Sequence, residues 1–224
     1  MHSFSNKLIF LLIGIFLCTI TNAQNQPTIR TTQITIARDS FGVPHIFAPT
    51  DPEVAYGLAW AHSEDDFKTI QTLILTGKGK LGTYMGKKGA PIDFVVGLLN
   101  TKALVDAQIS SMDPKFLALI DGYLAGLNAY AKAHPKEVLN KYVFPVSIEE
   151  YLSASVFSVA VFCGVDKTLP KILNGSVAHL AGFKGEGSNA FAIHSSKSSS
   201  GENMLVINAH QPIEGATAFY EAHL

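Results

Sequence analysis

Residues 184–210, KGEGSNAFAIHSSKSSSGENMLVINAH, contain two strand-like runs on either side of a serine-rich turn. The runs are Asn189–Ile193 and Met204–Asn208, and the turn is Ser198–Gly201. Short apolar runs separated by Gly and Ser residues are typical of a hairpin. The sequence therefore predicts a buried hairpin with Ser188 directly before its first strand.

Ser188 lies between Gly187 and Asn189, and the GxSxG and SxxK motifs of common serine enzymes are absent from the sequence. A serine can instead be activated by cleavage of the peptide bond before it. Its freed α-amino group, with an ordinary pKa of about 7.7–8.0, is a base close to its own hydroxyl. Glycine leaves the preceding carbonyl approachable. On these three residues alone, however, an ordinary Gly-Ser-Asn turn is the favoured interpretation.

The composition is that of a globular protein. The chain has 224 residues, a formal net charge of -1 and 47% hydrophobic residues. This content is sufficient for a packed core and argues against long-range disorder. Because the charge is close to balanced, the composition gives no reason to expect a nucleic-acid partner.

The first residues have the pattern of a secretory signal. One lysine precedes the apolar run Leu8–Leu17, and small and polar residues follow it up to Ala23. We therefore expect residues 1–23 to be a cleaved signal peptide and the protein to be periplasmic or secreted. The apolar run is shorter than the roughly 20 residues that span a bilayer, so no stable membrane span is expected after cleavage. Removal of Cys18 would leave only Cys163, which excludes an intramolecular disulfide.

A second hairpin is predicted near the start of the mature chain. Gln33–Arg38 alternates apolar and polar residues, residues 39–42 supply a turn, and Pro44–Ala48 is a second extended run. The Asp51-Pro52 pair then provides a start for a helix that continues at helical spacing to Ile74. The sequence thus begins with a hairpin followed by a long helix.

Another helix is predicted between Asp113-Pro114 and His134-Pro135, because proline favours the first turn and disfavours continuation of a helix. One face of this helix is apolar. The residues of that face are Phe116, Ile120, Leu124, Leu127 and Ala131.

A capping box of Ser147 and Glu150 predicts a further helix. Residues Leu152–Val161 are apolar nearly all round, so we expect this helix to be buried on several sides. Cys163 follows it, and the default interpretation of this residue is a buried structural thiol. Residues 167–187 lose the helical period and gain glycine, which predicts a linker or exposed loop.

Two further patterns have a structural interpretation that we prefer to a functional one. Residues 77–82 match GxGxxG, but the sequence after them is typical of a loop, whereas a dinucleotide site needs a helix there. Residues 62–66, HSEDD, combine imidazole and carboxylates, but consecutive residues of a helix point in different directions. We interpret the second group as solvated or capping polar residues and predict no metal site.

Four motifs occur in order along the chain, and together they resemble those of the penicillin amidase family of N-terminal-nucleophile hydrolases. The chain is most similar to the branch that deacylates acyl-homoserine lactones and lipopeptides such as aculeacin, and the resemblance covers nearly the whole mature chain. The motifs are RDSFGVPHI at Arg38–Ile46, GLAWAHSED at Gly57–Asp65, YLAGLNAY at Tyr123–Tyr130, and GSNAFAI at Gly187–Ile193 followed by Ser200-Gly201, Asn208, His210 and FYEAHL at Phe219–Leu224.

The resemblance implies an α+β fold, the αββα sandwich of N-terminal-nucleophile hydrolases. Residues 24–187 would form the largely helical α-chain region, and a short spacer at about residues 168–187 would be excised. Residues 188–224 would be the start of the β chain. In this family the precursor is several times longer, and the donors of the oxyanion hole lie beyond Leu224. Such donors typically contribute about 2.7–4 kcal/mol each to the transition state.

The resemblance also implies roles for particular residues. Gly187-Ser188 would be the autoproteolytic bond, and Ser188 would then attack the substrate amide while its α-amino group takes the proton, often through a water molecule. His210 matches a position that supports the amino group or the water, although a strand-end histidine satisfied by hydrogen bonds remains the alternative. Phe162 is implied as a residue of the acyl pocket.

The implied substrate is an N-acylated small molecule such as an acyl-homoserine lactone, a lipopeptide or a β-lactam. No cofactor is expected; some relatives hold calcium, but its ligands lie mainly downstream of this chain. We further expect this chain to be a truncated precursor that is inactive alone and needs a β-chain portion from the same precursor or an adjacent gene. The alternative is an exported, non-enzymatic binding or interaction protein in which Ser188 only begins a strand.

Overall fold

The structure is a computed structural model that describes residues 28–173, 187–215 and 217–224. The predicted signal peptide and most of the predicted spacer lie outside the described residues. The described helices and strands are β1 (Thr35–Arg38), β2 (Pro44–Phe47), α2 (Asp51–Gly77), α3 (Gly82–Met85), α4 (Ala90–Leu99), α5 (Thr101–Gln108), α6 (Pro114–Ala133), α7 (Ile148–Phe162), α8 (Val165–Leu173), β3 (Asn189–Ile193) and β4 (Met204–Asn208).

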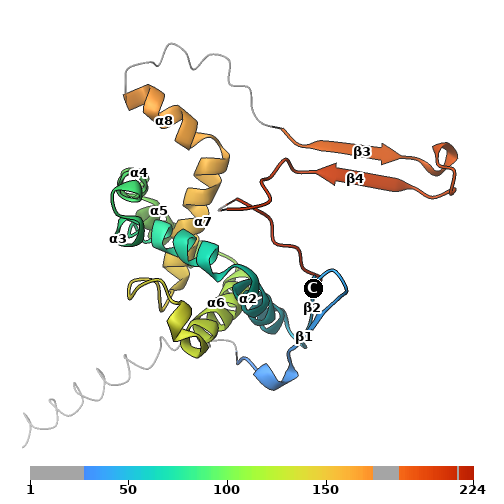
Figure 1. Cartoon of the computed structure of the whole chain (residues 1–224), viewed down its shortest axis with the longest axis horizontal. Helices are drawn as coiled ribbons and strands as arrows, with labels where there is room; N and C mark the ends of the chain where they lie inside the picture. Colours follow the sequence, from blue (N-terminus) through green and yellow to red (C-terminus); the bar gives the residue numbers. More distant parts are fainter. Residues whose placement is uncertain (1–27, 174–186, 216) are drawn as a thin grey trace, which may run out of the picture.

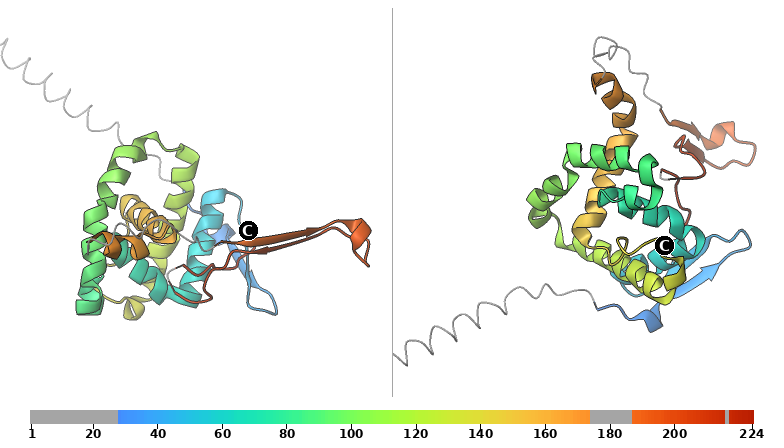
Figure 2. Two further views of the ribbon diagram at one scale, coloured as in Figure 1. Left: turned by 90° about the horizontal axis from the view of Figure 1, so that it is seen from above. Right: turned by 60° about the vertical axis from the view of Figure 1, so that its left-hand side comes forward.

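The described strands form two separate antiparallel pairs, β1 with β2 and β3 with β4. Helices α2 to α6 and the first half of α7 gather into one body, from which α8 projects, and the β1–β2 pair lies beside the start of α2 (Figure 1). The β3–β4 hairpin instead extends away from the helices, as the left view of Figure 2 shows. The α+β class predicted from the sequence is confirmed, as are both predicted hairpins.

The predicted helix boundaries are confirmed where they depend on local capping. The backbone N–H of Lys115 donates to the side chain of Asp113 at 2.8 Å, so Asp113 caps α6 as expected. Ser147 and Glu150 form the complete capping box at the start of α7. These side chains bind backbone N–H groups that have no partner within the first helical turn.

The core lies mainly between α2 and α6, where glycines allow the two helices to approach closely. A Cβ atom at Gly122 would lie 2.1 Å from the carbonyl oxygen of Pro52, and one at Gly126 would lie 2.4 Å from that of Tyr56. The buried apolar cluster is Ala59, Phe67, Ile70, Ile74, Leu75, Leu81, Val105, Ile120, Leu124, Leu127, Tyr130, Ala131, Val143, Val146 and Leu152.

Three expectations about burial and secondary structure were wrong. The second half of α7 is only partly buried, with Val159 62% and Phe162 67% exposed. The reason is that α7 packs on α2 and α5 through its first half, where Leu152, Ser153 and Ala154 are buried. Cys163 is accordingly exposed rather than a buried thiol. Helix α8 occupies residues 165–173, so the predicted loop cannot begin at residue 167.

Among the described helices, none has the length and apolar content required to cross a membrane.

An ion pair between the buried Glu53 and the half-exposed Arg30 holds the start of α2. Glu53 has no exposed surface and accepts hydrogen bonds from the backbone N–H and guanidinium of Arg30, at 2.8–3.0 Å, and from the hydroxyl of Thr50. The hydrogen bonds from Arg30 outweigh burial and lower the pKa of Glu53 from 4.5 to about 2. A carboxylate with a lowered folded-state pKa stabilises the fold above its unfolded pKa, and this contribution is lost as the pH falls.

We expect Glu53→Gln to lower the melting temperature at pH 7, because the variant leaves the guanidinium of Arg30 without its carboxylate. The difference from the wild type should shrink as the pH falls from about 4.5 towards 2, where the wild-type carboxylate takes up a proton. Thermal unfolding followed by circular dichroism across this range measures the effect. The exposed Glu214→Gln is the control and should follow the wild type at every pH.

Candidate active site

Ser188 directly precedes the first residue pair of the β3–β4 hairpin. This pair is Asn189 with Asn208, and the register continues to Ile193 with Met204. Gly187 and Ser188 are both exposed, and a Cβ atom at Gly187 would meet no atom within 4 Å. The Gly187–Ser188 peptide bond is therefore sterically open in the described structure.

His210 lies at the same end of the hairpin, two residues after β4. Its backbone N–H donates to the side-chain oxygen of Asn208 at 2.9 Å. The side-chain nitrogen of Asn189 lies 3.1 Å from Nε2 of the His210 ring. The structure thus brings His210 to the residue next to Ser188, with the hydrogen bonds expected of a strand-end histidine.

The prediction that this hairpin is buried was wrong, because every residue of β3 and β4 is exposed. Both faces carry apolar side chains, including Phe191 at 62% and Ile207 at 69% exposure. Alternation along a strand predicts which side chains share a face, but burial also requires a second layer against that face. Within the described residues, no such layer covers either face. The exposed ring of Phe162 on α7 likewise leaves its role in an acyl pocket a prediction.

The last described residues return to the first hairpin. The backbone N–H of Ile46 donates to the carbonyl oxygen of His223 at 2.8 Å, and the N–H of His223 donates to that of Pro44 at 2.9 Å. This forms a parallel bridge between His45 and His223, whose Nδ1 atoms lie 2.8 Å apart. The chain after the β3–β4 hairpin is therefore tied to β2.

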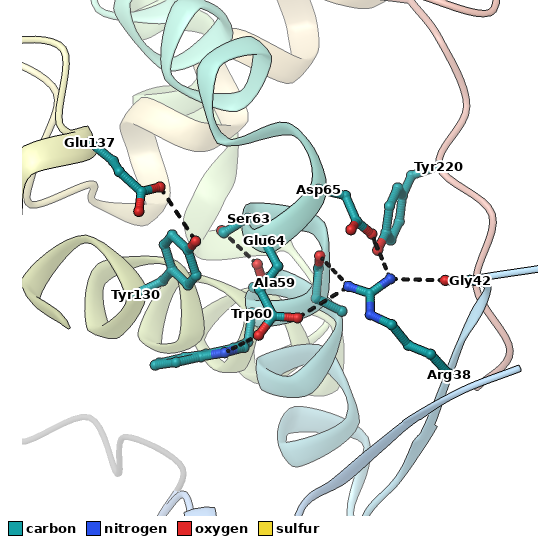
Figure 3. Close-up of polar contacts among 11 residues, drawn as sticks. Arg38, Gly42, Ala59, Trp60, Ser63, Glu64, Asp65, Tyr130, Glu137 and Tyr220 are labelled. Atoms are coloured by element: carbon teal, nitrogen blue, oxygen red, sulfur yellow. Dashed lines mark hydrogen bonds and ion pairs between the residues drawn. The ribbon is translucent and has the colours of Figure 1, made fainter. Parts of the chain in front are cut away.

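A charged cluster on α2 receives Tyr220 from the same terminal segment (Figure 3). The Tyr220 ring stacks on His62 with centroids 4.2 Å apart, and its hydroxyl donates to Asp65. The guanidinium of Arg38, at the end of β1, donates to Asp65 at 2.9 Å and Glu64 at 3.1 Å. The same guanidinium also donates to the carbonyl oxygen of Gly42, as Figure 3 shows.

The pKa shifts in this cluster reflect these contacts. Burial lowers the pKa of His62 and favours the neutral ring that stacks on Tyr220. Burial also acts to raise the pKa of Asp65, but the hydrogen bonds from Tyr220 and Arg38 outweigh it and the net pKa is lowered. Burial and the contact with Asp65 raise the pKa of the Tyr220 hydroxyl. Tyr220 is therefore held as a neutral donor to an ionised carboxylate.

The sequence interpretation of residues 62–66 as solvated or capping polar groups missed this contact. Asp65 and Tyr220 are 155 positions apart, so no local pattern connects them. The sequence feature that could have suggested this contact is the aromatic and histidine content of FYEAHL at residues 219–224.

Within the described residues, no group of three or more His, Cys, Asp or Glu side chains has the arrangement of a metal site.

We expect Tyr220→Ala to loosen the terminal segment, because it removes both the stack on His62 and the hydrogen bond to Asp65. The amide of Ile46, which donates to His223, should then exchange its hydrogen faster. Hydrogen exchange followed by mass spectrometry or NMR measures this. Phe219→Ala is the matched control, since its ring is 75% exposed, and it should leave the exchange of Ile46 unchanged. Equal effects of both variants would contradict the assigned role of Tyr220.

Residues 77–82, which match GxGxxG, connect helix α2 to the short helix α3. In a dinucleotide site the same motif would connect a strand to a long helix. The carboxylate of Asp93 accepts the backbone N–H groups of Leu81 and Gly82 at 2.7 and 2.8 Å. A phosphate loop uses such backbone donors for its ligand. Here they serve the packing of α3 against α4.

Comparison with known proteins agrees with the motifs. The chain has the α+β fold class of N-terminal-nucleophile hydrolases. Within that class it belongs to the penicillin amidase family, whose family model, described as "Penicillin amidase", matches residues 33–224.

Individual relatives are similar over most of this chain. It is 27% identical to the acyl-homoserine lactone acylase PvdQ of Pseudomonas putida, over 90% of this chain and 30% of the relative. It is 25% identical to the aculeacin-A acylase of Actinoplanes utahensis, over 84% of this chain and 29% of that relative. This chain thus spans about 30% of the length of these relatives. A solved structure of thermostable penicillin G acylase from Alcaligenes faecalis is 19% identical, with a TM-score of 0.47, and the match covers 64% of this chain and 88% of that one.

Proposed function

We propose that this chain supplies the helical region and the nucleophile of an N-terminal serine amidohydrolase that removes an acyl group from an N-acylated small molecule. The observation that carries the proposal is the placement of Ser188. It follows a sterically open glycine, directly before the first pair of an exposed hairpin, in a member of the penicillin amidase family. Because the chain spans about 30% of its relatives, we assign the activity to the assembled protein.

The first step in this proposal is cleavage of the Gly187–Ser188 bond. The Ser188 hydroxyl oxygen attacks the Gly187 carbonyl carbon, the carbon–nitrogen bond breaks, and the acyl group moves from nitrogen to oxygen. Water then hydrolyses the resulting ester, which leaves a carboxylate at Gly187 and a free α-amino group on Ser188. The exposure of both residues supports this step, since water must reach the ester.

The second step is acyl transfer from the substrate. The free α-amino group accepts the hydroxyl proton while the Ser188 oxygen attacks the carbonyl carbon of the substrate amide. The substrate amine leaves with a proton, and water hydrolyses the acyl ester to regenerate Ser188. We assign His210 to the support of the amino group or of a bridging water, because its ring contacts the residue next to Ser188. Phe162 remains the proposed apolar residue for the acyl group.

The proposed substrates follow from the relatives, two of which are named as acylases of acyl-homoserine lactone and of aculeacin A. We propose an acyl-homoserine lactone, a lipopeptide or a β-lactam as the N-acyl amide. The chemistry uses only protein groups and water, so no cofactor is assigned. We also propose export with cleavage of residues 1–23, and a β-chain portion as the partner that completes the site.

The experiment is incubation of the assembled protein with N-acyl-homoserine lactones of graded acyl length, with products identified by mass spectrometry. Amide hydrolysis gives a free fatty acid and homoserine lactone with a free amine. Opening of the lactone ring would instead leave the acyl group attached to nitrogen. Release of the free amine supports the proposal, whereas ring opening alone would contradict it.

A further inference from the structure

Two asparagines surround His210 at the open end of the β3–β4 hairpin. Asn189 and Asn208 face each other as the first residue pair of the ladder. Asn208 accepts the backbone N–H of His210, and the amide nitrogen of Asn189 contacts Nε2 of its ring. Backbone and ring of His210 are thus held by different strands.

The backbone of His210 needs such support. Its φ angle is 49°, in the left-handed region that residues other than glycine seldom adopt. A residue persists in this region only when its surroundings fix it. The hydrogen bond from His210 N–H to Asn208 closes a local turn of the kind that asparagine side chains commonly form. The side chain of Asn208 therefore fixes the backbone of His210, whereas the side chain of Asn189 contacts its ring.

The contact with Asn189 indicates where a neutral ring carries its proton. A side-chain amide nitrogen only donates hydrogen bonds, so Nε2 of His210 must be the acceptor. A neutral imidazole with an unprotonated Nε2 carries its hydrogen on Nδ1. We propose that Asn189 is a positioning residue that holds His210 as the neutral Nδ1–H tautomer. The Nδ1–H group is then the donor that His210 can offer to another partner.

The consequence for chemistry rests on the proposed function. A water that bridges the Ser188 hydroxyl and α-amino group must accept the hydroxyl proton and donate to the amine. A donor at Nδ1 of His210 would bind the second lone pair of that water and leave both of these roles free. The opposite tautomer would present an unprotonated Nδ1, which could only accept a hydrogen bond from the water and could not donate one to it. Asn189 thereby links the tautomer of His210 to proton transfer at Ser188.

Aspartate at position 189 provides a sharp test, because it has nearly the shape of asparagine but accepts hydrogen bonds instead of donating them. In Asn189→Asp the ring can keep this contact only if Nε2–H donates to the carboxylate. The neutral ring then carries its hydrogen on Nε2 instead of Nδ1. Asn189→Ala removes the contact and should give a mixture. Asn203 is the matched control: it lies near the turn of the same hairpin, where its side chain accepts the backbone N–H of Ser195 at 2.7 Å.

The measurement is ¹⁵N NMR of the histidine rings in the labelled chain, with the His210 signals assigned by their loss in His210→Gln. The pH is kept high enough for the rings to be neutral. We expect Nδ1–H in the wild type and in Asn203→Ala, a mixture in Asn189→Ala, and Nε2–H in Asn189→Asp. The same tautomer in all four chains, or Nε2–H in the wild type, would overturn the proposal.

The second measurement is the rate of amide hydrolysis by the assembled protein carrying the same variants. Asn189→Asp should lower kcat by about 10-fold or more, with KM nearly unchanged, because proton transfer and not substrate binding is affected. Asn203→Ala should keep the wild-type kcat. An unchanged kcat in Asn189→Asp, despite an inverted tautomer, would overturn the role in proton transfer. The NMR result judges Asn189 even if Ser188 proves not to be the nucleophile, so the two proposals can fail separately.

Discussion

Ser188→Ala is expected to abolish both the cleavage after Gly187 and the hydrolysis of N-acyl amides by the assembled protein. The variant lacks the oxygen that attacks the carbonyl carbon in each reaction. Loss of a nucleophile in a serine enzyme lowers kcat on the order of 10³-fold or more, and the residual rate comes from binding groups. The measurements are the mass of the chain ends and the release of free amine.

The control for this variant is Ser199→Ala, which changes an exposed serine in the turn of the same hairpin. It should process and hydrolyse as the wild type does. Ser188→Cys keeps a nucleophile at the same position and should retain some cleavage after residue 187. Undiminished amide hydrolysis by Ser188→Ala would contradict the assignment of the nucleophile, even if the protein is cleaved elsewhere.

Gly122→Ala is expected to give the largest loss of stability among substitutions of a single small residue in α6. The added Cβ would lie 2.1 Å from the carbonyl oxygen of Pro52, so α2 and α6 must move apart where Gly122 meets Pro52. Overpacking of this kind costs about 1–3 kcal/mol, and we expect the upper end because the obstacle is backbone. The measurement is the midpoint of urea unfolding.

Gly97→Ala is the matched control, because Gly97 lies within α4 and a Cβ atom there would meet nothing within 4 Å. It should leave the fold intact and stabilise it by about 0.5–1 kcal/mol through the higher helix propensity of alanine. If Gly122→Ala proves as stable as Gly97→Ala, the described contact between α2 and α6 is wrong.

The parts of the fold that the sequence predicted are those fixed by nearby residues. The capping box of Ser147 and Glu150 and the cap at Asp113 join residues only three and two positions apart. The local pattern is therefore sufficient to place both helix starts. The helix over residues 165–173 was missed, because the glycine-rich residues beyond it dominated the interpretation of the whole segment.

Burial was predicted less well, because it depends on which surfaces meet in space. The apolar stripe of α6 is buried at Ile120, Leu124 and Leu127, where α2 packs against it, whereas Phe116 is 49% exposed. Phe162 is apolar, and so are most residues of the β3–β4 hairpin, yet both lie exposed in the described structure. Burial of an apolar side chain is energetically favourable, but the sequence pattern does not identify the element that would cover it.

Within the candidate site, the sequence singled out Ser188 and His210, and the structure places them at one end of a hairpin. The ring contact of His210 with Asn189 could not be predicted, because it needs the strand register and the left-handed backbone of His210. The docking of Tyr220 on Asp65 joins residues 155 positions apart. Both contacts join residues that are far apart in the sequence, so they become visible only in three dimensions.

The most direct test of the account is identification of the chain ends in a preparation of the assembled protein that hydrolyses N-acyl amides. Mass spectrometry with chemical labelling of free α-amino groups determines whether Ser188 is an N-terminal residue. We expect a chain that begins with Ser188 and carries a free amine, in proportion to the activity of the preparation. Full activity in a protein with an intact Gly187–Ser188 bond would contradict the role of Ser188 as an N-terminal nucleophile.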